Sequence, residues 1–154
     1  MHSVRFTDQL KALIGIAVRL RKEIDAEALV VLLEGTADFA KLKALVGDAK
    51  LIAAADTADQ LAGASEAGLL SVRIDMPDAP IYERLSQAVL EAVADDLLSP
   101  GAKVVTLYSG FDVEALDSIS VMDLDEHLNR LTGRDLRQLE TRVPLDTLKL
   151  VVDL

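Results

Sequence analysis

Apolar residues follow two different patterns along the chain. Between Thr7 and Ile24 they recur every three or four residues, which is the spacing of one helical face. Thr7 is placed to cap this helix, because a threonine hydroxyl accepts a hydrogen bond from a free amide of the first turn. Residues 28–33 (Ala-Leu-Val-Val-Leu-Leu) instead form a short, unbroken apolar run. A run of this kind is typical of a strand that is buried on both faces.

The alternation of helical and strand-like patterns continues as far as residue 122. The elements predicted after the first strand are, in chain order, a helix over 38–47, a strand over 50–55, a helix over 61–67 that Asp56 and Thr57 cap and Gly68 ends, a strand over 69–74, a helix over 81–98, and strands over 103–108 and 118–122. Strands that alternate with helices are typical of βαβ crossovers. We therefore predict a three-layer α/β/α fold with a mostly parallel, five-stranded sheet, in which the more polar last strand can run antiparallel.

The tail of the chain has a different pattern. Residues 125–131 and 133–139 predict short helical pieces, and Pro144 stands at the start of a helix that reaches Leu154. This last helix has neither a glycine cap nor a basic last turn. We therefore divide the chain into an α/β domain over 1–124 and a helical extension over 125–154. We expect the extension to lead into a further domain.

Composition excludes several classes of protein. The 154 residues carry 26 acidic and 16 basic side chains, a formal net charge of −10, which argues against a nucleic-acid partner because phosphates require a basic patch. The chain has no cysteine, so it has no disulfide framework, thiolate metal site or cysteine nucleophile. Its longest apolar run is far shorter than the roughly 20 residues that span a bilayer. We expect a soluble, cytoplasmic domain with no membrane partner.

Motifs for catalysis or cofactor binding are missing from the sequence. No glycine-rich phosphate loop follows a predicted strand, and Ser109 lacks the Gly-x-Ser-x-Gly context of a hydrolase nucleophile. Asp123, Asp125, Glu126 and His127 form an acidic cluster that matches neither a calcium loop nor a zinc site. Capping of a helix start by Asp125 and Glu126 explains the cluster better. We expect no catalytic residue, no metal and no cofactor in this chain.

Several strings occur in the order in which one known family has them. They are residues 51–57 (LIAAADT), 97–105 (LLSPGAKVV) and 117–121 (DSISV), and over residues 7–124 the chain resembles the C-terminal α/β domain of pyruvate kinase. The resemblance implies the strand order 3-2-1-4-5 and no catalytic residue, because the kinase active site lies in other domains. Regulated members have a phosphate-binding turn after the first strand. Here that turn is residues 34–38 (EGTAD), whose two carboxylates would repel a phosphate.

A second resemblance covers the junction between this domain and its extension. Residues 108–111 (YSGF), 117–121 and 139–149 (LETRVPLDTLK) are similar to bacterial proteins that join such a module to a DisA-type, diadenylate-cyclase-like domain. The resemblance implies a covalently linked nucleotide-binding domain after Leu154 and a parent protein connected with cyclic di-AMP. The cyclase motifs Asp-Gly-Ala and Arg-His-Arg are absent from the chain. We therefore do not expect this domain to synthesise a cyclic dinucleotide.

The implied strand order also predicts where a ligand binds. Ligands of open parallel sheets lie beyond the carboxyl ends of the strands, at the point where the strand order reverses. Here that crevice lies between the first and fourth strands. The candidate ligand-binding residues are Glu34, Gly35 and Thr36 on one wall, Ser109, Gly110 and Phe111 on the other, and Asp56, Thr57 and Asp75 along the same edge. The carboxylates favour a cationic or hydroxyl-rich ligand. Phe111 either lines this crevice or covers the sheet end as a hydrophobic lid.

These observations support two functional hypotheses of different classes. The first is a non-catalytic sensor or regulatory domain that binds a small-molecule effector in the crevice and signals through the C-terminal helix. The alternative is a structural dimerisation module without a ligand, a homo-oligomer in which the first and last helices supply the apolar faces. A stand-alone enzyme is the weakest hypothesis, because the sequence offers no catalytic constellation.

Overall fold

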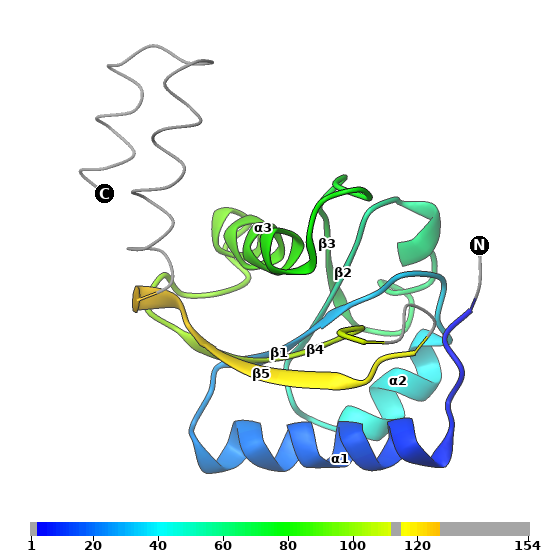
Figure 1. The fold of residues 1–154 in the computed structure, drawn as a ribbon. Coiled ribbons are helices and arrows are strands. Elements are labelled where there is room, and N and C mark those ends of the chain that lie inside the picture. The colour runs from blue at the N-terminus through cyan, green and yellow to red at the C-terminus, as the bar shows by residue number, and fades with distance from the viewer. Residues whose placement is uncertain (1–2, 112–114, 127–154) are drawn as a thin grey trace.

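Five strands form one mixed sheet in the middle of the molecule (Figure 1). The computed structural model describes residues 3–111 and 115–126. In spatial order, the strands are β3 (Leu70–Arg73), β2 (Leu51–Ala55), β1 (Ala28–Leu32), β4 (Lys103–Tyr108) and β5 (Ser118–Asp123). The first four are parallel and β5 pairs antiparallel with β4. The predicted α/β class, the order 3-2-1-4-5 and the antiparallel last strand are confirmed.

Helices cover both faces of the sheet. Figure 1 shows α1 (Asp8–Glu23) and α2 (Phe39–Val46) below the sheet and α3 (Ile81–Ala94) above it. Successive side chains of a strand point to opposite faces, so β1 sends Leu29 and Val31 toward α1 and α2, and Val30 and Leu32 toward α3. All five residues of β1 are buried. This double burial explains why the strand reads as an unbroken apolar run.

The ends of the first two helices follow from residues that the sequence places there. Thr7 Oγ1 accepts a hydrogen bond from Leu10 N at 3.1 Å, and Asp38 Oδ1 accepts one from Lys41 N at the same distance. Each of these side chains satisfies one amide that the first helical turn leaves free. Gly47 ends α2 at a φ of 63°, a conformation that glycine adopts without steric cost.

Two predicted helices differ from the observed ones. In place of a helix over 61–67, the chain forms one 3-10 turn, η1 (Asp59–Leu61), followed by further turns. Gly63 adopts a φ of 94°, which interrupts any helix through this segment. The helix predicted over 81–98 ends at Ala94, because Asp96 takes the left-handed region at a φ of 60°.

The described part of the chain ends just after β5. Residues 124–126 are helical, and Asp123 Oδ1 accepts a hydrogen bond from Asp125 N at 3.2 Å at the start of this turn. The remaining parts of the tail, His127 and the helix predicted from Pro144 included, lie outside the described residues. The division of the chain at residue 124 therefore stays a prediction. Among the helices of residues 3–111 and 115–126, none combines the length and the apolar character that crossing a membrane requires.

Glu27 lies directly before β1 and contacts two other segments at the amino edge of the sheet. Its Oε1 accepts a hydrogen bond from the Ser99 hydroxyl at 2.7 Å, and its Oε2 accepts one from Ser99 N at 3.0 Å. Lys50 Nζ lies 3.9 Å from Oε2. The Ser99 hydroxyl bond above all, aided by the Ser99 amide and the Lys50 charge, holds the pKa of Glu27 below its ordinary value of 4.5, against the opposing effect of burial.

We expect Glu27→Gln to lower the free energy of unfolding at neutral pH and to lose this effect in acid. The folded-state pKa of Glu27 lies below the unfolded value, so its ionised form stabilises the fold above pH 4.5. That contribution disappears as the pH falls through the lowered pKa. Urea unfolding from about pH 3 to about pH 7 measures the difference between wild type and variant. Glu66→Gln, at an exposed glutamate, is the matched control, and a wild-type-to-variant difference independent of pH would contradict the assignment.

Candidate functional site

The order of the strands reverses between β1 and β4. From β1 the chain moves to β2 and β3 on one side, and the crossover through α3 then brings it back to β4 on the other side of β1. The turns that follow β1 and β4 therefore leave neighbouring strands in different directions. This is the place at which open α/β sheets bind ligands.

All nine predicted ligand-binding residues follow the carboxyl ends of parallel strands. Glu34, Gly35 and Thr36 follow β1, Asp56 and Thr57 follow β2, Asp75 lies after β3, and Ser109, Gly110 and Phe111 follow β4. Their surroundings differ widely, because Asp56 is only 5% exposed whereas Phe111 is 95% exposed. The structure therefore gathers these residues at one edge but does not make them a single cluster.

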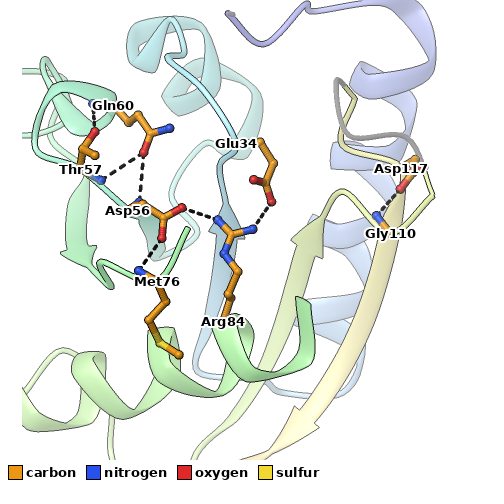
Figure 2. A network of polar contacts seen from close by, with 8 residues as sticks. All are labelled: Glu34, Asp56, Thr57, Gln60, Met76, Arg84, Gly110 and Asp117. Carbon is orange, nitrogen blue, oxygen red and sulfur yellow. Dashed lines mark hydrogen bonds and ion pairs between the residues drawn. The ribbon is translucent and has the colours of Figure 1, made fainter. Parts of the chain in front are cut away.

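Arg84 joins two of the predicted acidic residues. It projects from the first turn of α3 between Glu34 and Asp56 (Figure 2). Its Nη1 lies 2.5 Å from Glu34 Oε1, its Nη2 lies 2.6 Å from Asp56 Oδ2, and its side chain is 5% exposed. A buried guanidinium held by two carboxylates ties the ends of β1 and β2 to the helix that crosses above them.

Asp56 is the more firmly held of the two carboxylates. Its Oδ1 accepts a hydrogen bond from Met76 N at 2.9 Å, which attaches the end of β2 to the segment after β3. The backbone amides of Asp56 and Thr57 both donate to Gln60 Oε1 at 3.1 Å, and Thr57 Oγ1 accepts from Gln60 N at 3.3 Å. Asp56 and Thr57 therefore hold a tight turn together with Gln60 (Figure 2).

Arg84 changes the electrostatics that the sequence predicted for this edge. It offsets one of the two negative charges of Glu34 and Asp56, so the expected attraction for a cation is reduced. Asp75 does not join this cluster. Its side chain is 73% exposed, and its carboxylate lies 3.9 Å from the exposed Arg73.

Arg84 was not among the residues predicted from the sequence, although the sequence contained a signal for it. Arg84 lies on the apolar face of α3, beside the buried Leu85 and four residues before Ala88. A charged residue within a helix's apolar stripe requires a buried partner. Two acidic residues directly after apolar strands were the available partners.

The loop after β4 is held by Asp117, which was not among the predicted site residues. Asp117 accepts hydrogen bonds from Gly110 N at 2.7 Å and from Phe111 N at 3.2 Å (the Gly110 bond is drawn in Figure 2). A Cβ atom at position 110 would overlap the Ser118 hydroxyl, which explains the glycine there. The Phe111 side chain is almost fully exposed, so in this structure it neither covers the sheet end nor packs into the crevice as a wall.

A cavity of about 430 Å³ lies on the side of α1, beside this loop. It lies between the start of α1 with the segment before it and the residues that lead into β5, and it is lined by Arg5, Thr7, Gln9, Leu10, Ala115, Leu116 and Asp117. Val4 N donates to Thr36 O at 2.8 Å, which places the segment before α1 against the turn after β1. The sequence had no pattern that predicted this cavity, because its two walls are more than a hundred residues apart.

Metal ligation finds no support in the part of the chain that the structure describes. No group of three or more histidine or acidic side chains there is arranged to hold a metal ion. In the acidic cluster that begins with the last residue of β5, Asp123 Oδ1 accepts a hydrogen bond from Asp125 N.

Residues 9–132 match the model of a family described as the probable sensor domain DacZ_P. The chain belongs to this family. A search of curated proteins finds no match. The part matched to DacZ_P contains all five strands, Arg84 and the nine predicted ligand-binding residues. The C-terminal pyruvate kinase domain remains a resemblance in sequence.

We expect Arg84→Met to lower the free energy of unfolding by about 3–5 kcal/mol, because it leaves the buried Asp56 without its counter-ion. Adding Asp56→Asn to this variant should recover part of the loss, since the amide carries no charge. Urea unfolding at neutral pH measures both effects.

Arg73→Met is the matched control for this experiment. Its ion pair with Asp75 is exposed, so we expect a change below about 1 kcal/mol. If Arg84→Met costs no more than Arg73→Met, the Arg84 cluster does not hold the strand ends together.

Proposed function

We propose that this chain is a non-catalytic sensor domain that binds a small, polar effector at the carboxyl edge of the sheet, where the strand order reverses between β1 and β4. Membership of the DacZ_P family supports the sensor role. The position of the predicted residues at this edge supports the binding site.

The state of Glu34 is the observation that carries this proposal. Its Oε1 is bonded to Arg84, while its Oε2 has no hydrogen-bond partner among the described residues. The side chain is 24% exposed, so a ligand can reach this second oxygen without displacing Arg84. A carboxylate oxygen held in this way accepts hydrogen bonds from hydroxyl or ammonium groups. Glu34 therefore favours a hydroxyl-rich or cationic effector.

Arg84 gives the bound effector a route to the rest of the domain. A ligand bound to Glu34 competes with Arg84 for the negative charge of the Glu34 carboxylate. Arg84 in turn lies in the first turn of α3. Binding at the turn after β1 thereby alters the contact between this turn and α3. Such a differential contact is what a ligand needs in order to shift a conformational equilibrium.

The receiver of the signal, in our proposal, is a nucleotide-binding domain of the DisA type, covalently linked after residue 154. The sequence resemblance at the domain junction supports this arrangement, and it connects the parent protein with cyclic di-AMP. The cytoplasmic location is part of the same proposal. The chain itself supplies sensing and no chemistry, in keeping with its family.

The alternative, a dimerisation module without a ligand, has less support from the structure. The apolar stripe of α1 is buried against the sheet through Leu10, Ile14 and Ala17, and Ile16 is the large hydrophobic side chain of α1 that is exposed. The first helix therefore does not offer the apolar face that we expected. The last helix lies outside the described residues, and the homo-oligomer stays a prediction.

Effector binding is tested by thermal shift with a panel of polyols, sugars and small amines, followed by calorimetric titration of each hit. We expect at least one compound to raise the melting temperature. Glu34→Gln should weaken its binding about tenfold, which corresponds to loss of one charge-assisted hydrogen bond.

Glu83→Gln serves as the matched control, because Glu83 is an exposed glutamate next to Arg84 on α3. It should leave the affinity unchanged. A panel without a stabilising compound, or equal effects of the two variants, would refute binding at Glu34.

A further inference from the structure

We propose that the cavity between the start of α1 and the residues before β5 is a second binding site, for a small organic oxyanion with a short apolar body. Arg5 holds the charged group of this ligand. The inference goes beyond the proposed function, because the site shares no residue with the Glu34 crevice and takes an anion, whereas Glu34 favours a hydroxyl-rich or cationic ligand.

The size of the cavity suits a small metabolite. Its volume of about 430 Å³ lies within the range of roughly 300–1,000 Å³ that is usual for small-molecule sites. Leu10, Ala115 and Leu116 supply an apolar part of the wall, and Thr7 and Gln9 supply a polar part. A mixed lining of this kind fits a ligand that has one apolar and one polar end.

Among the residues that line the cavity, Arg5 supplies a positive charge that can pair with a ligand. Arg5 is exposed and forms no ion pair or side-chain hydrogen bond within the described residues. Asp117, the other charged residue in the lining, already accepts bonds from two backbone amides and from the Ser118 hydroxyl. The guanidinium is therefore the charged group with unused hydrogen-bonding capacity, and it presents five donors to a carboxylate or phosphate.

The backbone on both sides of Arg5 is already held in place. Val4 N bonds to Thr36 O on one side, and Thr7 Oγ1 accepts the Leu10 amide on the other. Binding at Arg5 therefore orders one side chain and no backbone, which lowers the entropic cost of binding. In a chain with a net charge of −10, this local arrangement must supply the attraction for an anion, because the overall charge opposes it.

The test compares three charged probes and one neutral probe by calorimetric titration of the 154-residue chain. 4-Methylpentanoate and isobutyl phosphate carry an apolar body, inorganic phosphate carries none, and 4-methylpentanamide is neutral. We expect at least one of the first two to bind and both inorganic phosphate and the amide to bind at least tenfold more weakly. The preferred head group distinguishes a carboxylate ligand from a phosphate ester.

Three variants locate the site. Arg5→Gln should weaken binding about tenfold through loss of a charge-assisted contact. Ala115→Phe should weaken it to a similar extent by filling the cavity without changing any charge. Arg19→Gln removes the same charge from an exposed position of α1 outside the cavity and should have no effect.

Two outcomes overturn the inference. One is the absence of binding by both apolar probes up to about 10 mM, beyond the affinity range of a specific site. The other is equal weakening by Arg5→Gln and Arg19→Gln, which would show attraction by diffuse charge. Binding that Glu34→Gln abolishes and Arg5→Gln leaves unchanged would likewise refute the second site, and it would support the Glu34 crevice of the proposed function.

Discussion

A sheet that is buried on both faces is the constraint on which this domain depends. Alternate side chains of the central strands pack against α1 and α2 on one face and against α3 on the other. A polar group within such a layer loses its hydration and is tolerated only when it is hydrogen-bonded. In the central strands β1, β2 and β4, polar residues that can meet a ligand are therefore confined to the strand ends. Both candidate sites lie at the edge where the parallel strands end.

The Arg84 cluster shows how charge enters this layered structure. Asp56 and Arg84 are the charged side chains that are buried among the described residues, and they are bonded to each other. Because a buried charge requires its partner, this one shared contact joins the first turn of α3 to the turns after β1 and β2. A ligand that engages Glu34 acts on this contact. In the proposed sensor, this contact connects the binding site with α3.

The two candidate sites share one edge but present opposite chemistry. Glu34 offers an acceptor near α3, and Arg5 offers donors on the side of α1. Hydrogen bonds attach the walls of the α1 cavity to the two turns at the reversal of strand order, because Val4 N donates to Thr36 O and the Asp117 carboxylate accepts from Gly110 N. An α/β scaffold of this kind supports many functions, and the polar residues at its strand ends distinguish one from another. Membership of a probable sensor family agrees with a site that binds without reacting.

Features of the fold with a local physical cause were determined by the sequence. The caps at Thr7 and Asp38 bond to amides three residues away, and the strands are recognisable because burial on both faces demands continuous apolar side chains. The helix that the apolar spacing predicted over 61–67 was wrong, because the positive φ of Gly63 interrupts it. The pairing of charges was decided by tertiary packing instead. Arg84 lies 28 positions from Asp56 and 50 from Glu34, and the two walls of the α1 cavity are still further apart. Contacts over such separations depend on the order of the strands and on the helix that crosses them, so no local pattern of residues specifies them.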